Sequence, residues 1–326
     1  MKSALTACVL ALGLPLAAAQ ADECPPLAIV GQADLTAAPD GLSYYVPMEI
    51  AGVNKLMLLD TGSAQSVISP KTAAELGLKL KRSNIRLYSV TGSYSDVMAT
   101  APIAIGALKA SSFDFMLAPA NMVDDDPQIG GILGADILSQ FDVSVDFARR
   151  KLDIISQKHC DGRVTYWKER PVAVIPFELL KSGHIVLPVE LEGRTIKAIL
   201  DTGASNSTLR RIVAENEFGL KLGSADAPAA GDLNGEAGSM VWRHSFKTLT
   251  FEGIAVFNPL FVIIPDRAKN HFDDKELGSL ISHPDEQAEP DILLGMNVLR
   301  RLHLYIAYKE KKLYISPAAP TEASKP

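Results

Sequence analysis

The sequence has few of the features that direct a protein to nucleic acid, metal or membrane. Its 326 residues carry a formal net charge of −6 and no cluster of Lys and Arg, so a phosphate-binding face is not expected. The six His residues show no pair with metal-ligand spacing, and the three Cys residues include no Cys-x-x-Cys pair. We therefore predict no nucleic-acid partner, no metal site and no cofactor.

The one pronounced apolar run lies at the N-terminus. Ala4–Leu16 is followed by small residues that end at Ala21, a pattern typical of a secretory signal peptide. The run is too short for a spanning helix. We predict a signal peptide over residues 1–21 and a mature chain without an integral membrane segment. The protein is then exported, to the periplasm or the extracellular space. Lipoprotein processing at Cys8 is disfavoured because almost no hydrophobic run precedes it, whereas a retained signal that tethers the protein is a second alternative.

Removal of this segment leaves two cysteines, Cys24 and Cys160. In an exported chain, two cysteines predict a disulfide bond. The bond would join the mature N-terminus to the end of the first half. Two free thiols are the alternative interpretation.

The most informative feature is an internal repeat. Leu58–Ser63 returns as Ile199–Ala204, 141 residues later, and Phe141–Ile154 returns as Leu302–Ile315, 161 residues later. The larger offset places an insertion in the second half, for which the polar stretch 266–290 is the best candidate. A repeat this long predicts two folding units of one shape, and two copies favour a pseudo-symmetric pair over a solenoid.

Gly and Pro are spread along the chain, as is typical of a turn-rich β protein. Alternating residues predict strands over Leu42–Ile50 and Lys55–Leu59 with a turn at Gly52–Asn54, and Pro70 begins a short helix that ends at Gly77. The organisation that we predict is a lead-in over 22–41, a first lobe over 42–156, a connector over 157–171, a second lobe over 172–316 and a disordered tail over 317–326.

Each copy of the repeat ends an apolar strand at a carboxylate, Asp60 or Asp201, which Thr and Gly follow. An acid at such a position is costly unless it is used or satisfied. Two carboxylates that face each other cannot both ionise, so the pair holds one proton. The ionised member can take a proton from water that attacks a peptide carbonyl, and the protonated member can donate to the oxyanion. This chemistry requires neither a metal nor a covalent intermediate.

These residues resemble the motifs of retropepsin-like and pepsin-like aspartic proteases. Both halves contain apolar-apolar-Asp-Thr-Gly-Ser/Ala, and both contain a later apolar-apolar-Gly, at Ile132–Gly134 and Leu293–Gly295. The resemblance implies a mainly β fold of two retropepsin-like β-barrel lobes with an active-site cleft between them. It implies an aspartic endopeptidase that acts on protein or peptide substrates, with Asp60 and Asp201 catalytic. Because one chain supplies both motifs, we expect a monomer. The alternative is an inactive peptide-binding or scaffolding module of the same fold.

The residues around the two Asp are expected to support them. By the resemblance, Thr61 and Thr202 hydrogen-bond across the interface. The glycines that follow, Gly62 and Gly203, let backbone N–H groups approach the carboxylates.

The two motifs differ at one position, where Ser63 in the first half corresponds to Ala204 in the second. A hydroxyl that donates to a carboxylate lowers its pKa. We therefore predict that Asp60 is the more readily ionised member of the pair.

Two polar hairpin tips follow the Asp motifs at similar distances, where family members carry a flap over the substrate. One interpretation is that the tips cover a bound peptide, and the other is that they are ordinary turns. The flap residues under the first interpretation are Gly92, Tyr94, Asn234 and Gly235.

Overall fold

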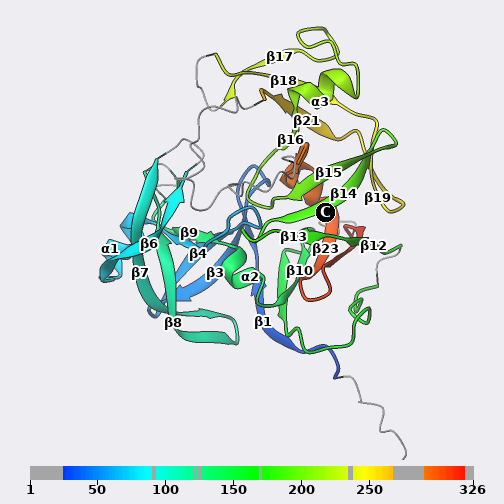
Figure 1. Cartoon of the computed structure of the whole chain (residues 1–326). Helices are drawn as coiled ribbons and strands as arrows, with labels where there is room; N and C mark the ends of the chain where they lie inside the picture. The colour runs from blue at the N-terminus through cyan, green and yellow to red at the C-terminus, as the bar shows by residue number, and fades with distance from the viewer. Residues whose placement is uncertain are drawn as a thin grey trace, which may run out of the picture.

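The computed structural model describes residues 25–89, 93–120, 122–123, 126–168, 171–233, 238–266 and 290–319. The fold is mainly β, with two lobes and a six-stranded sheet to which both halves of the chain contribute (Figure 1). The predicted signal peptide, Cys24 and nearly all of the predicted insertion 266–290 lie outside the described residues, and so does most of the predicted tail.

The first lobe contains a closed barrel. Its strands are β2 (Thr36–Ala37), β3 (Tyr44–Ile50), β4 (Val53–Leu59), β5 (Val67–Ile68), β6 (Leu80–Tyr88), β7 (Tyr94–Ile105), β8 (Leu108–Leu117) and β9 (Ile129–Leu133). They pair in the order β2-β3-β4-β9-β5-β8-β7-β6, and the additional pairing of β3 with β7 closes six of them into a barrel. Two short helices, α1 (Pro70–Glu75) and α2 (Ala135–Leu138), complete the lobe.

The second lobe repeats this strand order. Its elements are β13 (Glu178–Leu179), β14 (Ile185–Leu191), β15 (Arg194–Leu200), β16 (Ser207–Arg210), α3 (Arg211–Asn216), β17 (Ala229–Asp232), β18 (Met240–Ser245), β19 (Thr248–Phe251), β20 (Ile254–Phe257), β21 (Leu260–Ile264), β22 (Ile292–Leu294) and α4 (Met296–Leu299). The order β15-β22-β16 corresponds to β4-β9-β5 in the first lobe. Among the described residues of the second lobe, however, no pairing of β14 with β18 closes the sheet as β3 with β7 does in the first lobe. The prediction of two related, mainly β lobes is confirmed.

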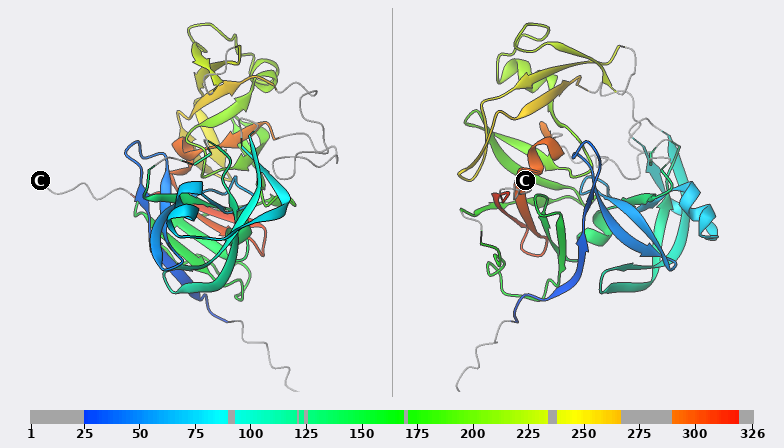
Figure 2. Two further views of the ribbon diagram at one scale, coloured as in Figure 1. Left: turned by 90° about the vertical axis from the view of Figure 1, so that its left-hand side faces the viewer. Right: turned by 180° about the vertical axis from the view of Figure 1, so that it is seen from behind.

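A six-stranded sheet joins the two halves (Figure 2). Its strands are β1 (Ile29–Asp34), β10 (Asp142–Asp146), β11 (Lys151–Ile155), β12 (Ala173–Pro176), β23 (Leu302–Ala307) and β24 (Lys312–Pro317). The order β1-β11-β10-β23-β24-β12 takes three strands from each half, and the antiparallel pair β10–β23 lies at the centre. The sequence did not predict this shared sheet, nor the strands β1 and β2 within the lead-in.

The turn that leads into each Asp strand is tighter than predicted. Ile50 of β3 pairs directly with Val53 of β4, so the turn consists of Ala51 and Gly52, with φ of 50° and 85°. Two successive positive φ angles match the right-handed twist of a hairpin, and glycine adopts them at little cost. The predicted turn over Gly52–Asn54 therefore begins one residue too late and ends two residues too late, because Val53 and Asn54 already belong to β4.

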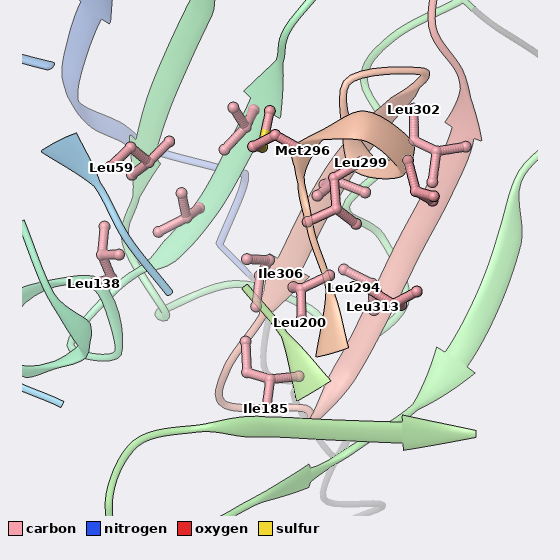
Figure 3. Close-up of a cluster of buried hydrophobic side chains, with 14 of the residues drawn as sticks. Leu59, Leu138, Ile185, Leu200, Leu294, Met296, Leu299, Leu302, Ile306 and Leu313 are labelled. Carbon is pink, nitrogen blue, oxygen red and sulfur yellow. The ribbon is translucent and has the colours of Figure 1, made fainter. Parts of the chain in front are cut away.

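The apolar residues before each Asp anchor the strand ends in one core. Leu59 and Leu200 are 1% and 0% exposed and belong to a cluster that spans both lobes. Figure 3 shows Leu59 and Leu138 of the first lobe on one side of this cluster, and Leu200 and Leu294 of the second lobe on the other. Full burial of a leucine stabilises a fold by about 1.5–3 kcal/mol. The positions of the two Asp residues are thus set by a continuous core.

Candidate active site

Each Asp lies where its strand leaves the core. Asp60 follows β4 and donates its N–H to Leu133 O at 3.1 Å, and Asp201 follows β15 and donates to Leu294 O at 3.0 Å. In the first lobe the acceptor strand β9 runs parallel to β4, which ends at Asp60, and antiparallel to β5, which follows the turn. In the second lobe β22 runs in the same way relative to β15 and β16. The two Asp loops therefore have the same backbone frame.

The glycine after each acceptor strand allows this crossing. A Cβ atom on Gly134 would lie 2.6 Å from Gln65 O, and one on Gly295 would lie 2.5 Å from Asn206 O. These contacts are with backbone, which cannot move aside as a flexible side chain does. The apolar-apolar-Gly motif, which both halves of the chain contain, thus lets each Asp loop pass close over its neighbouring strand.

Two threonines connect the loops across the lobes. Thr61 N donates to Thr202 Oγ1 at 3.0 Å, and Thr202 N donates to Thr61 Oγ1 at 3.1 Å. Each hydroxyl then donates to the opposite lobe, Thr61 Oγ1 to Leu200 O and Thr202 Oγ1 to Leu59 O, both at 2.8 Å. Both threonines are buried. The four bonds hold the two loops at a fixed separation.

Replacement of Thr61 by Val keeps the shape of the side chain but removes its hydroxyl. Thr202 N–H and Leu200 C=O would then be buried without a partner, which costs about 1–3 kcal/mol for each group. We expect Thr61→Val to lower the free energy of unfolding by about 2–4 kcal/mol in urea titrations. Thr61→Ser keeps the hydroxyl and is the control. Equal stability of the Val and Ser variants would contradict this account of the interface.

The glycines after the threonines bring the carboxyl groups together. A Cβ atom on Gly62 would lie 2.5 Å from Asp201 Cγ, and one on Gly203 would lie 2.3 Å from Asp60 Cγ. Each glycine thus packs against the acid of the other lobe. The backbone N–H of Gly62 also donates to Asp60 Oδ1 at 2.8 Å, and that of Gly203 donates to Asp201 Oδ1 at 2.9 Å.

The two carboxyl groups perturb each other. Burial raises the pKa of both above the ordinary value, and the charge of Asp201 raises the pKa of Asp60 further. Backbone N–H groups partly oppose this rise in both pKa values, those of Gly62 and Ser63 at Asp60 and those of Gly203 and Ala204 at Asp201. The arrangement favours a proton on Asp60 and a charge on Asp201. Both residues keep partial exposure to solvent.

The prediction that Asp60 is the more readily ionised member loses the contact on which it was based. It assumed that the Ser63 hydroxyl donates to the Asp60 carboxylate, but Ser63 Oγ donates to Gln65 O at 2.9 Å. The hydroxyl stabilises the turn instead.

The sequence analysis missed a pair of polar contacts behind the loops. In the first lobe, Asp136 Oδ1 accepts from Ser66 Oγ at 2.6 Å, and Asp136 Oδ2 accepts from Ser66 N at 2.9 Å. In the second lobe, Asn297 Oδ1 accepts from both Ser207 Oγ and Ser207 N at 2.8 Å. The offsets of the repeat contained the signal, because Ser66 and Ser207 differ by 141 and Asp136 and Asn297 by 161.

The predicted flap is described only in part. Tyr94, at the start of β7, is 56% exposed. Its ring lies 5.6 Å from that of Tyr88, and the Arg86 guanidinium lies 5.3 Å from its centroid. The other three predicted flap residues, Gly92, Asn234 and Gly235, lie outside the described residues. The flap stays a prediction.

The described residues contain neither a membrane-spanning helix nor a metal-binding cluster. No helix among them is long and apolar enough to cross a membrane. Within the same parts of the chain, no three His, Cys, Asp or Glu side chains gather where a metal ion could be held.

Comparisons with known proteins match one protein-family model and 417 chains of solved structures. A model of a family described as aspartyl protease matches residues 46–137 and 187–298, one segment in each lobe. No curated protein shows a significant match to the sequence. Among solved structures, the crystal structure of an aspartic proteinase from Irpex lacteus aligns with 13% identity and a TM-score of 0.49, over 91% of this chain and 99% of that chain.

Proposed function

Because the chain belongs to the aspartyl protease family, we propose that it is an aspartic endopeptidase whose catalytic residues are Asp60 and Asp201. One observation carries the proposal: each lobe packs a glycine directly against the acid of the other lobe, so two largely buried carboxyl groups lie side by side. A pair that shares one proton supplies both a general base, the ionised carboxylate, and a general acid, the protonated carboxyl group.

In the proposed mechanism, Asp201 is the base and Asp60 the acid. Asp201 takes a proton from water as the water oxygen attacks the peptide carbonyl carbon, and Asp60 donates its proton to the carbonyl oxygen. Collapse of the tetrahedral intermediate breaks the C–N bond. Asp201 then protonates the leaving amine, and Asp60 recovers a proton from the hydroxyl that becomes the new carboxyl group. The charge of Asp201, which raises the pKa of Asp60, supports this assignment.

Digestion of a denatured protein by the purified mature chain tests the proposal. We expect cleavage at internal peptide bonds, and mass spectrometry of the fragment ends would give the residue preference. A peptide-binding module of the same fold would retain peptides without cutting them. Binding without new fragment ends, at every pH tested, would contradict the endopeptidase assignment.

We also propose that the mature protein is exported, to the periplasm or the extracellular space, and acts as a monomer. The N-terminal apolar run supports export, and the presence of both Asp motifs in one chain supports the monomer. An oxidising compartment would favour the predicted bond between Cys24 and Cys160. N-terminal sequencing of exported material should begin at Asp22, and a retained signal would show the uncleaved start instead.

A further inference from the structure

A hairpin of the second lobe reaches the Asp loop of the first lobe. It connects β13 to β14 and is closed by hydrogen bonds from Gly183 N to Leu180 O and from Leu180 N to His184 O, both at 2.9 Å. Gly183 has a φ of +86°, the left-handed conformation expected of glycine after a type I turn. A Cβ atom on Gly183 would lie 2.6 Å from Ala135 Cβ of α2. The tip of the hairpin is thus packed closely on the first lobe.

His184 extends this contact into the site. Its Nε2 lies 2.8 Å from Gly62 O. The residue is buried, with 4% of its surface exposed. The backbone N–H of Gly62 donates to Asp60 Oδ1, so the same residue that holds the Asp60 carboxyl is held by His184. One imidazole of the second lobe therefore fixes the Asp loop of the first.

The hydrogen bonds define which ring nitrogen carries a proton. A carbonyl oxygen only accepts, so Nε2 must carry a hydrogen in order to bond Gly62 O. Nδ1 lies 2.6 Å from Ser182 Oγ, and a hydroxyl can either donate or accept. Both hydrogen bonds are therefore compatible with a neutral and with a charged imidazole.

The groups around His184 act on its charge in opposite directions. Burial, the largest effect, lowers the pKa of His184 below its ordinary value, although the hydrogen bond to the Gly62 carbonyl and the charge of Asp201 act to raise it. The influence is mutual, because a charged His184 lowers the pKa of Asp201. From α2, Ala135 is apolar, and Asp136 is bonded to Ser66. Gly62, which bonds His184, also packs against the Asp201 carboxyl group, so Asp201 is the acid whose charge acts on this histidine.

The first lobe has no counterpart of this histidine. At the offset of 141 residues, His184 corresponds to Ser43. We propose that His184 is a positioning residue of the carboxyl pair, which holds the Asp60 loop through Gly62 and, when protonated in acid, keeps Asp201 ionised. This inference rests on the proposed function and deepens it, since it assigns the acid limit of activity to one side chain.

Two substitutions separate the two roles. His184→Gln can keep a donor at the position of Nε2 but cannot carry a charge, and His184→Ala loses both. We expect His184→Gln to keep kcat within about threefold at its optimum, with the acid limb of the kcat/KM profile moved to higher pH. We expect His184→Ala to lower kcat by about tenfold or more at every pH, because the loop loses its anchor. Identical profiles for wild type and His184→Gln would overturn the proposal.

His244→Gln is the matched control. His244 lies on β18 of the second lobe and bonds Asp226 O through Nδ1, so this substitution removes a histidine from the same lobe at another place. We expect its acid limb to coincide with that of wild type. An equal shift in both variants would assign the effect to overall charge and overturn the proposal.

A measurement without turnover keeps the proposal separate from the proposed function. NMR of ¹⁵N-labelled histidines gives the tautomer and the pKa of His184, whose signal the His184→Gln variant identifies. We expect a hydrogen on Nε2 in the neutral ring, and a lower pKa for His184 in Asp201→Asn than in wild type, because the attracting charge is gone. An unchanged pKa would overturn the proposal even in an active enzyme. An inactive wild-type chain with the expected shift would contradict the proposed function alone.

Discussion

Replacement of either Asp60 or Asp201 by Asn should reduce peptide hydrolysis by at least about 10⁴-fold. Asparagine has nearly the same shape but cannot exchange a proton in the working pH range. In Asp201→Asn the base is lost, and in Asp60→Asn the acid is lost, so either variant lacks one half of the proton transfer. Because the two groups act as a unit, the double variant should be no worse than either single variant. A single variant with more than about one tenth of wild-type kcat/KM would contradict the assignment.

The stability of these variants provides the control. Burial and the neighbouring charge raise the pKa of Asp60 in the folded state. A carboxyl with a raised pKa binds its proton more tightly when folded, so it stabilises the fold below its unfolded pKa and loses that contribution as pH rises through the folded pKa. Asparagine stays neutral at every pH, so Asp60→Asn removes the loss of stability that the ionisation of Asp60 causes as the pH rises. We expect its Tm to exceed that of wild type at neutral pH, and the difference to shrink in acid. Inactivity with an unchanged or higher Tm cannot result from unfolding.

Replacement of Gly203 by Ala should also nearly abolish activity. The added Cβ would lie 2.3 Å from Asp60 Cγ, closer than real Cβ contacts allow, so the carboxyl group must move. A displacement of about 1 Å at a reacting group costs about 10²-fold in rate. We expect kcat to fall by about 10²-fold or more, and overpacking to lower the free energy of unfolding by about 1–3 kcal/mol. Gly62→Ala should act in the same way on Asp201.

Gly77→Ala is the matched control for these glycine variants. Gly77 follows α1, has a φ of +61° and has open space where a Cβ would lie. Alanine is strained there by about 1 kcal/mol but touches nothing. We expect a slightly lower Tm and an unchanged kcat. If Gly203→Ala reduced activity no more than Gly77→Ala, the close contact between the lobes would not matter for catalysis.

The sequence predicted the parts of the fold that depend on local pattern. Two apolar residues before an acid, followed by Thr and Gly, define a strand end and a turn wherever they occur, and the offset of 141 residues related Asp60 to Asp201. The helix after Pro70 was predicted well, since α1 begins at that proline and the side chain of Ser69 caps it.

Contacts between distant segments were beyond the sequence. The central strands β10 and β23 come from two apolar runs that the sequence showed separately. No sequence pattern indicates that these two strands pair with each other. The sequence did not show that the Ser63 hydroxyl donates to Gln65 O rather than to the Asp60 carboxylate. His184 gave no signal either, because its partner Gly62 lies 122 residues away, in the other lobe.

The pH dependence of kcat/KM for wild type, with one peptide substrate between about pH 2 and about pH 9, tests the central claim most directly. If the pair must hold one proton, activity falls in acid, when both carboxyl groups are protonated, and again at higher pH, when both are ionised. The raised pKa of Asp60 predicts that the upper limb lies well above the ordinary range of an aspartate. A bell-shaped profile with both limbs supports two carboxyl groups that share one proton. A profile with a single limb, or one that keeps rising to the alkaline end, would contradict it.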